Sequence, residues 1–221
     1  MAGVAGWLRT IAAVACLVLA GAAPAQVPGK KFVQINPPQP TQAPAGKVEV
    51  IEFFSYACPH CASLQPSLAA WLKRKPADVE FRRVPAVFNE SWAPLAQLYY
   101  TLEAMGLVEK LHHDVFAAIH TQKIKLQDPK MLGDWIASKG VNRQKFNDTY
   151  NSFSVRSLAK RAIDTGGRYR LEFTPALVID GRYLTGPSMT ATGNTIDYDG
   201  FFRVVDELIA MSRRTDRKGK K

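Results

Sequence analysis

A strand-like apolar run that ends directly on two cysteines is the feature that most constrains the fold of this chain. Residues 52–61 read Glu-Phe-Phe-Ser-Tyr-Ala-Cys-Pro-His-Cys, so the run from 48 to 55 leads straight into Cys58 and Cys61. Both faces of this run carry bulky side chains, which is typical of a strand inside a sheet. Pro59 suits the first turn of a helix, and apolar residues recur at helical spacing from there to Lys75. The cysteine pair therefore lies where a central strand is predicted to turn into a helix.

The first 25 residues have the pattern of a secretory signal peptide. A single charge, Arg9, precedes a short apolar core, and Ala23-Pro24-Ala25 supplies the small residues that signal peptidase requires. The apolar run is well short of the roughly 20 residues that cross a bilayer. We expect cleavage after Ala25, which also removes Cys16 and leaves Cys58 and Cys61 as the cysteines of the mature chain.

One closely spaced cysteine pair in an exported protein indicates a chemical role for the two thiols more than a disulfide that stabilises the fold. Disulfides persist outside the cytoplasm, but a loop this small adds little stability. Two alternatives remain. One is half of a zinc site, for which the chain offers no second cysteine pair, and the histidines at 112, 113 and 120 lie in a different segment. The other is an inert structural disulfide, which the strand-to-helix context disfavours.

The formal net charge of +10 is concentrated at the C-terminal end. Residues 213–221 contain six basic side chains and one acidic side chain. We interpret this segment as a solvated, disordered basic tail, with attraction to anionic membranes or nucleic acid as the less favoured interpretation. Because no phosphate loop or nucleic-acid motif accompanies the charge, no nucleic-acid partner is expected.

Strand and helix patterns on either side of a helical block predict an interrupted α/β domain. Residues 48–55, 59–75 and 79–84 give a strand, a helix and a parallel strand. Helical patterns then follow at 91–105, 107–121, 128–139, 142–151 and 154–165, with expected stops at Gly106, Gly140 and Gly166. Strand patterns return at 176–179 and 182–184 around Asp180-Gly181, a strong hairpin turn, before a last helix at 198–211.

These patterns define the expected segments of the chain. A proline- and glutamine-rich N-terminal arm covers 26–46, with 32–35 as its one possible strand. The α/β domain comprises 47–88 and 168–212, the helical insertion 89–167, and the basic tail 213–221.

The helix start explains why the two cysteines should differ. Free backbone N–H groups and the positive end of the helix dipole favour a thiolate at Cys58, which lowers its pKa. Cys61 lies one turn further on, close enough to attack a mixed disulfide formed at Cys58. We therefore predict Cys58 to be the nucleophile and the more exposed of the two thiols, and Cys61 to be the buried resolving thiol, with no metal, nucleotide or haem cofactor.

Two neighbouring residues are candidates for supporting roles. His60 lies between the cysteines, where an imidazolium or a dipole would lower the pKa of Cys58, although an ordinary exposed helix histidine is the alternative. Glu52 shares a strand face with Val50 and Phe54, so burial should raise its pKa and let it exchange protons with Cys61. A hydrogen-bonded core carboxylate without a role is an equally weighted alternative for Glu52.

These motifs resemble the DsbA family of periplasmic thiol oxidases. The resemblance rests on Glu52-Phe53-Phe54-Ser55 leading into Cys58-Pro59-His60-Cys61, on Thr174-Pro175-Ala176 before the hairpin turn, and on the helical insertion. It covers nearly all of the mature chain except the arm and the tail. It implies a thioredoxin-like fold interrupted by a helical insertion, a buried acid at Glu52, and a Pro59-His60 dipeptide that tunes the redox potential.

The resemblance also implies that Pro175 is cis beside the active site. The sequence alone leaves a trans proline at a strand start open, because few X-Pro bonds in folded proteins are cis. A cis Pro175 would leave the Thr174 backbone free to pair with an extended substrate. The chain departs from the family pattern at Thr174, where some members carry an apolar residue. It also has Gln65-Pro66 where members can carry further acids.

The function implied by the resemblance is donation of the Cys58-Cys61 disulfide to newly exported proteins with free thiols in the periplasm. A quinone-linked membrane reoxidase of the DsbB type is the implied partner, and we expect a monomer. The nearest alternative is a disulfide isomerase or reductase. Isomerases of this superfamily typically add a dimerisation domain, for which residues 26–46 are too short. A non-enzymatic peptide-binding module is the alternative from another class.

Overall fold

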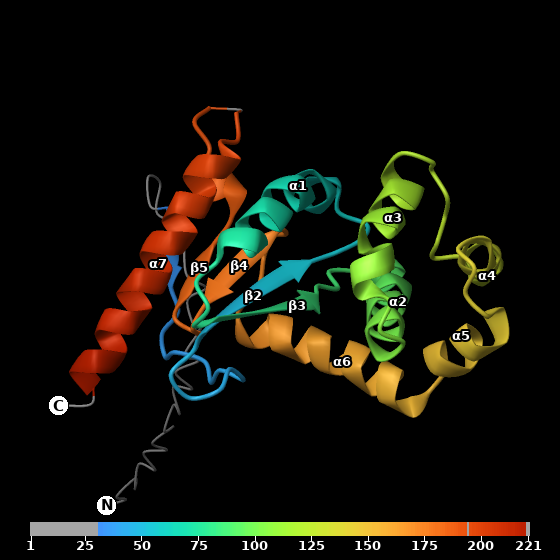
Figure 1. Cartoon of the computed structure of the whole chain (residues 1–221), viewed down its shortest axis with the longest axis horizontal. Coiled ribbons are helices and arrows are strands. Elements are labelled where there is room, and N and C mark those ends of the chain that lie inside the picture. Colours follow the sequence, from blue (N-terminus) through green and yellow to red (C-terminus); the bar gives the residue numbers. More distant parts are fainter. Residues whose placement is uncertain (1–30, 194, 220–221) are drawn as a thin grey trace, which may run out of the picture.

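The computed structural model describes residues 31–193 and 195–219. The predicted signal peptide lies outside the described residues, as do residues 26–30 of the arm and the last two lysines. The described chain forms a mixed sheet in the order β1-β5-β4-β2-β3 (Figure 1). The strands are β1 (Val33–Gln34), β2 (Val48–Phe54), β3 (Val79–Pro85), β4 (Ala176–Ile179) and β5 (Tyr183–Thr185).

Central strand β2 joins the two halves of the α/β domain. It pairs in parallel with β3 and antiparallel with β4, so strands from before and after the helical block share one sheet, as predicted. The helices are α1 (Pro59–Arg74), α2 (Ala93–Ala104), α3 (Val108–His120), α4 (Pro129–Ser138), α5 (Arg143–Tyr150), α6 (Phe153–Arg168) and α7 (Tyr198–Gly219). Short 3₁₀ turns lie at Glu90–Trp92 and Pro187–Met189. Helices α2 to α6 follow β3 and precede β4, which confirms the predicted α/β fold with a helical insertion.

Helices cover both faces of the sheet (Figure 1). On one face, Val50 and Leu177 pack in a cluster with Leu68 of α1 and with Phe201 and Leu208 of α7. The opposite face contributes Ile51, Phe53 and Val178 to a second cluster that includes residues of α6. None of the helices that the structure describes is both long and apolar enough to cross a membrane.

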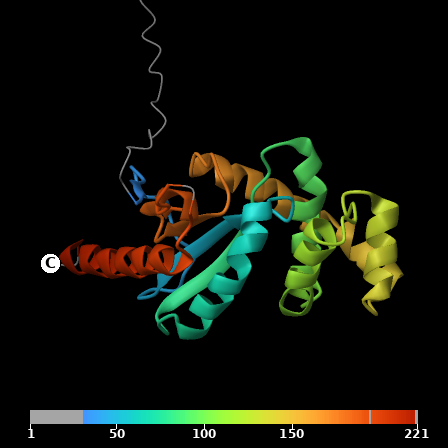
Figure 2. The same ribbon diagram turned by 90° about the horizontal axis from the view of Figure 1, so that it is seen from above.

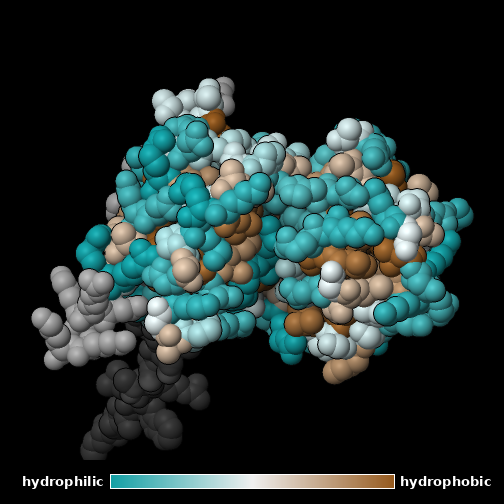
Figure 3. Space-filling view, viewed as in Figure 1, coloured by the Kyte–Doolittle hydropathy of each residue, from teal (hydrophilic) through white to brown (hydrophobic). Residues whose placement is uncertain are grey.

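The helical insertion shares its core with the sheet. The second cluster continues from the sheet into α2 and α3, where Phe54 at the end of β2 meets Tyr99 and Phe116. Figure 2 shows the insertion beyond the carboxyl end of β2, where the cysteine motif begins. Apolar groups also reach the surface over the insertion, between hydrophilic ones (Figure 3). The most exposed large apolar side chains of the described residues are Phe88, Met131, Phe153 and Ile163.

Local sequence signals account for several element boundaries. The side chains of Asp128, Asn142 and Ser152 accept hydrogen bonds from backbone N–H groups at the starts of α4, α5 and α6. Asp180 and Gly181 both have positive φ angles, 53° and 63°, as the two central residues of a type I′ hairpin turn require. The predicted hairpin is therefore confirmed.

The predicted stop of the last insertion helix at Gly166 is wrong. Helix α6 continues through Gly166 and Gly167 to Arg168. Two glycines inside a helix cost only about 2 kcal/mol relative to alanine, and the helix end is held by the buried Tyr169, whose ring packs against Phe53. The chain leaves the helix at Arg170, which takes the left-handed conformation (φ 48°) expected at a helix end.

The interpretation of residues 213–221 as a disordered tail is wrong for its first part. Helix α7 runs on to Gly219 without a break. Arg213 makes two hydrogen bonds to Asp78, at 2.6 and 2.8 Å, and Ser212 donates to Asp180 at 2.9 Å. These contacts fix the helix to the start of β3 and to the hairpin, so Arg213 belongs to the folded domain.

The described part of the arm adds a strand to the sheet. Val33 and Gln34 pair with Leu184 and Tyr183 of β5, which confirms the one strand predicted in this segment. Further along, the backbone N–H of Gln39 donates to the carbonyl oxygen of Gly181 at 2.9 Å. The arm therefore lies along the hairpin and is held by backbone hydrogen bonds.

Candidate active site

Cys58 caps the N-terminus of α1, as predicted from the sequence. Its backbone is extended (φ −86°, ψ 115°), and its Sγ atom accepts a hydrogen bond from the backbone N–H of Cys61 at 3.3 Å. The Cys58 N–H donates to the carbonyl oxygen of Ser55 at 3.0 Å, which closes the turn between β2 and α1. Both cysteines are free thiols in this structure.

The environment of Cys58 favours its thiolate. A hydrogen bond with the Cys61 thiol makes the largest contribution, and Thr174 and the backbone N–H groups of Cys61 and His60 add to it. Together they lower the pKa of Cys58 to about 6, against the opposing effect of burial. His60 thus contributes through its backbone at the helix start. Its side chain is exposed, as is that of Pro59.

The environment of Cys61 instead favours its protonated thiol. The residue is fully buried, and burial raises the pKa of its thiol well above the usual value, with further increases from the Cys58 sulfur and from the negative charge of Glu52. Cys58 retains an exposed fraction of 5%. The pKa values of the two thiols are therefore shifted in opposite directions, as the sequence predicted: the thiolate is favoured at Cys58 and the protonated thiol at Cys61.

The loop before β4 lies against the reactive sulfur. The Thr174–Pro175 peptide bond is cis, as the family resemblance implied, and Cys58 Sγ lies 3.5 Å from the carbonyl oxygen of Thr174. Gly186 permits this packing, because a Cβ atom there would lie 2.5 Å from Phe173 Cε2 and 2.9 Å from the Pro175 carbonyl oxygen. The absence of a side chain at 186 thus lets the loop approach the end of β5.

A small pocket opens beside the cysteine motif. Its volume is about 90 Å³, and it is lined by His60, Thr174, Pro175, Pro187, Ser188, Ile196 and Tyr198. These residues come from the start of α1, the cis-proline loop, the turn after β5 and the start of α7. Thr174, whose carbonyl oxygen lies 3.5 Å from Cys58 Sγ, is among these residues, so the pocket lies close to the reactive sulfur.

Glu52 lies on β2 and has no exposed surface. Its Oε1 atom accepts from Gln65 Nε2 and its Oε2 atom accepts from Arg83 Nε, each at 3.0 Å. Burial raises the pKa of Glu52, although the positive charge of Arg83 and the two hydrogen bonds oppose that rise. The direction of the shift agrees with the sequence-based expectation.

Further buried residues around Glu52 were not predicted. Gln65 also donates to the carbonyl oxygen of Cys61 at 3.2 Å, and its Oε1 atom lies 3.1 Å from His112 Nε2. His112 Nδ1 in turn lies 2.8 Å from the hydroxyl of Tyr56. Gln65 lies four residues after Cys61, on the same helix face, and this spacing could have singled it out. His112 and Arg83 carry no local signal, because only packing brings their helix and strand to this place.

Nothing in the described residues resembles a metal site. No group of three or more histidine, cysteine, aspartate or glutamate side chains within 31–193 and 195–219 could hold a metal ion. His112 and His120 instead make hydrogen bonds to the side chain and to the backbone oxygen of Tyr56.

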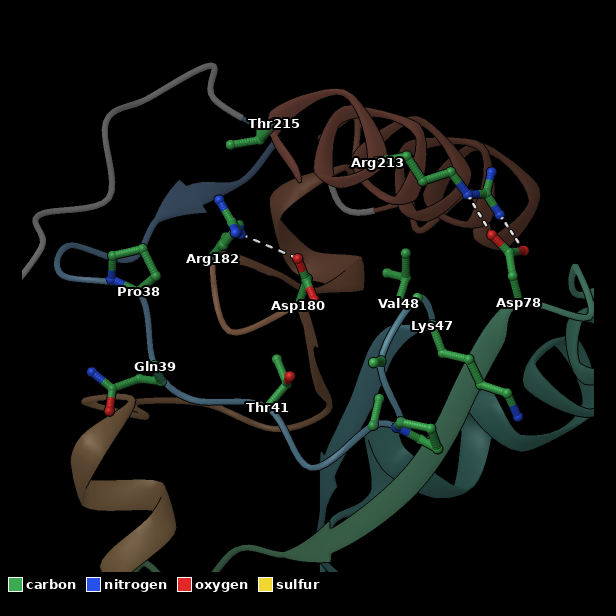
Figure 4. A pocket seen from close by; sticks show the side chains of 14 residues that line it. Pro38, Gln39, Thr41, Lys47, Val48, Asp78, Asp180, Arg182, Arg213 and Thr215 are labelled. Atoms are coloured by element: carbon green, nitrogen blue, oxygen red, sulfur yellow. Dashed lines mark hydrogen bonds and ion pairs between the residues drawn. The ribbon is translucent and has the colours of Figure 1, made fainter. Parts of the chain in front are cut away.

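A larger pocket of about 860 Å³ lies at the other end of the sheet, between the arm and α7 (Figure 4). It adjoins Lys47 and Val48 at the start of β2, whereas the cysteines follow the end of that strand. Its prominent charges are paired, Arg213 with Asp78 and Arg182 with Asp180. This pocket contains no cysteine and is separate from the dithiol.

The α/β fold carries a cysteine of low pKa at a helix start and a second, buried cysteine one turn later, and a cis-proline loop faces the first of them. These features define the class of thioredoxin-fold dithiol oxidoreductases. A family model described as thioredoxin matches residues 43–198.

Curated relatives and solved structures narrow this class. The chain is 44% identical over 207 residues to the thiol:disulfide interchange protein DsbA of Bordetella parapertussis, covering 94% of this chain and 96% of that protein. The Pseudomonas aeruginosa protein of the same name is 40% identical over 155 residues, with 70% and 73% covered. The crystal structure of Pseudomonas aeruginosa DsbA superimposes with a TM-score of 0.79 at 35% identity, covering 86% of this chain and 95% of that one. The oxidoreductase DsbA of Xylella fastidiosa gives 0.74 at 35% identity, with 86% and 98% covered.

The chain therefore belongs to the DsbA family and is a thiol:disulfide oxidoreductase.

Proposed function

We propose that this enzyme donates its Cys58–Cys61 disulfide to newly exported proteins in the periplasm and so assists their oxidative folding. The observation that carries this proposal is the contrast between the two thiols. Cys58 has a pKa of about 6, whereas the pKa of the buried Cys61 is raised. A stabilised Cys58 thiolate favours the reduced form, and an enzyme whose reduced form is favoured is an oxidant.

The exchange proceeds in two steps. A substrate thiolate attacks Cys58 Sγ, the bond between Cys58 and Cys61 breaks, and Cys61 leaves with the electron pair and takes up a proton. A second substrate thiolate then attacks the substrate sulfur of the mixed disulfide, and Cys58 leaves as a thiolate. Two substrate thiols become one disulfide, while the enzyme disulfide becomes a dithiol.

Glu52 is the group we assign to the proton of Cys61. It is buried behind the cysteine, and its negative charge contributes to the raised pKa of Cys61. A carboxyl group with a raised pKa can give a proton to the departing Cys61 sulfur and take it back when Cys61 attacks. The alternative of a carboxylate without a role predicts no change in rate when Glu52 is replaced by glutamine.

Thr174 and Pro175 are assigned to substrate binding. The carbonyl oxygen of Thr174 already faces Cys58 Sγ, and both residues line the small pocket beside His60. An extended peptide with its cysteine at Cys58 would lie along this loop, and backbone pairing there would bind it with little sequence preference. Pro59 and His60 are exposed at the same place and would contact the bound chain.

Turnover needs an external oxidant, and we assign this role to a quinone-linked membrane reoxidase of the DsbB type. The enzyme would reach the periplasm through its leader, act there as a monomer and use no cofactor. No helix among the described residues is long and apolar enough to cross a membrane.

A redox titration against glutathione tests the direction of transfer. We expect a reduction potential less negative than about −200 mV, toward the value of about −120 mV typical of a strong oxidant and away from the roughly −270 mV of thioredoxin. A potential near the thioredoxin value would favour the reductase alternative. A non-enzymatic binding module would bind unfolded peptides unchanged after Cys58→Ser and would oxidise none of them.

A further inference from the structure

A chain of buried hydrogen bonds runs from the loop before the cysteines to Glu52. It joins the Tyr56 hydroxyl to His112 Nδ1 at 2.8 Å, His112 Nε2 to Gln65 Oε1 at 3.1 Å, and Gln65 Nε2 to Glu52 Oε1 at 3.0 Å. All four residues are buried, with exposed fractions of 3% or less. They come from β2, the following loop, α1 and α3, which are far apart in the sequence.

The chemistry of the partners fixes the direction of every bond. Both groups that face Gln65 Nε2, the Cys61 carbonyl oxygen and Glu52 Oε1, are acceptors, so the amide NH₂ must point toward them. Gln65 Oε1 therefore faces His112 and can only accept, which requires a proton on His112 Nε2. Neutral His112 then has a bare Nδ1 atom, to which the Tyr56 hydroxyl donates.

His112 is neutral over the working range of the enzyme. Burial, reinforced by the positive charge of Arg83, lowers its pKa to about 2. The rings of Phe54 and Phe116 pack against it at centroid distances of 5.3 and 5.2 Å, which excludes water from the imidazole. Burial likewise raises the pKa of Tyr56, so its hydroxyl remains a donor.

We propose that His112, held in its Nε2–H tautomer by Tyr56, orients Gln65 so that the amide donates to Glu52. Tyr56, His112 and Gln65 are then positioning residues for the carboxylate that exchanges protons with Cys61. This inference rests on the proposed role of Glu52. Each hydrogen bond along the chain donates toward the carboxylate, so the chain keeps Glu52 ready to accept a proton.

The other charged and titratable groups around Glu52 do not supply the hydrogen bond that Gln65 donates to its Oε1 atom. Arg83 of β3 occupies the second carboxylate oxygen. Cys61 of α1 and Tyr56 of the loop are the titratable neighbours, and His112 of α3 acts through Gln65. Without the donor from His112, the Gln65 amide can rotate its oxygen toward Glu52, where it would favour the protonated carboxyl.

The test follows the step in which Cys61 resolves a mixed disulfide. The full-length protein is trapped as a Cys58–glutathione disulfide, and glutathione release is measured against pH. In this step Cys61 gives its proton to Glu52 and attacks Cys58, a new Cys58–Cys61 bond forms, and glutathione leaves as a thiolate. The step does not depend on whether the enzyme works as an oxidase or a reductase, so a failure of the proposed function would be seen separately in the glutathione titration.

We expect His112→Phe to shift the midpoint of this pH profile upward by about one unit, because a hydrogen bond to the carboxylate is weakened. His113→Phe is the matched control, since His113 is the next residue on the helix and is exposed. Tyr56→Phe should shift the profile in the same direction. Tyr99→Phe is its control and should not shift the profile, because it removes a hydroxyl from the same aromatic cluster that takes no part in the hydrogen-bond chain from Tyr56 to Glu52. All shifts should vanish in a Glu52→Gln background.

A measurement on the unmodified protein tests the proposal even if one of the variants folds poorly. Nitrogen NMR of the ring should show His112 protonated at Nε2 and bare at Nδ1 from pH 5 to 8. A proton on Nδ1 overturns the proposal. So does a His112→Phe profile that matches His113→Phe, or a shift that persists when Glu52 is glutamine.

Discussion

Cys58 Sγ lies 3.5 Å from the carbonyl oxygen of Thr174, although 116 positions separate the two residues in the sequence. The contact joins the start of α1 to the loop before β4, across the whole helical insertion. The backbone of Thr174 therefore lies directly beside the reactive sulfur. The two residues meet because β2, which leads to Cys58, and β4, which follows Pro175, are neighbours in the sheet.

The two cysteines should differ in reactivity. Alkylation of the reduced protein followed by peptide mapping should label Cys58 with a rate that rises through a midpoint near pH 6. Cys61 should stay unlabelled until much higher pH, because burial raises its pKa. Preferential labelling of Cys61 at mildly acidic pH would reverse the assigned roles.

The stability of the reduced protein should depend on pH through both thiols. The folded pKa of Cys58 lies below its unfolded value of 9.0, so the thiolate stabilises the fold fully above that value, and the contribution is lost as pH falls through about 6. At pH 7 it is worth about 1 kcal/mol. Cys61 has a raised folded pKa and therefore destabilises the fold as pH rises past its unfolded value.

Denaturant unfolding measures this dependence. The part of the stability of the reduced form that depends on Cys58 should rise from pH 5 to 8, while the raised pKa of the buried Glu52 opposes that rise. Above about pH 9 the stability should fall, and at pH 7 it should exceed that of the oxidised form. The Cys58→Ser variant should lose the rise between pH 5 and 8. A reduced form less stable than the oxidised form at pH 7 would contradict the oxidase direction.

Replacing Arg83 by methionine should lower the free energy of unfolding, because it leaves a buried carboxylate without its ion-pair partner. Glu52 has no exposed surface and loses its ion-pair partner, so we expect a loss of about 3 kcal/mol at pH 7. The loss should shrink below about pH 4, where Glu52 is protonated in the unfolded state as well.

Two comparisons make the Arg83 result specific. Arg74→Met breaks an exposed pair with Asp206 and should cost less than about 1 kcal/mol. Adding Glu52→Gln to Arg83→Met should restore most of the lost stability, because the buried charge is removed. A loss that is unchanged in the double variant would mean that Arg83 acts by packing on Phe81.

Gly186→Ala should lower the reactivity of Cys58 without touching either cysteine. The new methyl group would lie 2.9 Å from the Pro175 carbonyl oxygen and 2.5 Å from the Phe173 ring, so the cis-proline loop must move. We expect the rate of disulfide exchange to fall about tenfold or more, because the loop positions the incoming thiol.

The control for this variant lies in α6. A Cβ atom at Gly167 would meet no atom within 4 Å, so Gly167→Ala should leave the rate unchanged and stabilise the helix by about 0.5 to 1 kcal/mol. Equal rates for Gly186→Ala and the unmodified enzyme would show that the loop position is not critical.

The sequence by itself determined the elements and the place of the dithiol. A run with bulky side chains on both faces predicted β2, and Asp180-Gly181 specified the hairpin. Helical spacing predicted α1 to α7, with ends that differ by up to three residues for α1 to α6 and with a C-terminus of α7 that was placed eight residues too early. Cys58 could be placed at a helix start because Pro59 and the preceding strand are adjacent in the chain. These features depend on backbone conformations that neighbouring residues set.

Only the tertiary structure decided which groups surround the dithiol. The partners of Gln65 are Glu52, 13 residues away, and His112, 47 residues away, and no local pattern links them. The continuation of α6 past Gly166 and of α7 past Ser212 likewise depends on contacts with Tyr169 and Asp78. Side-chain partners follow from how helices pack on the sheet, and burial then determines which hydrogen bonds must form and in which direction they donate.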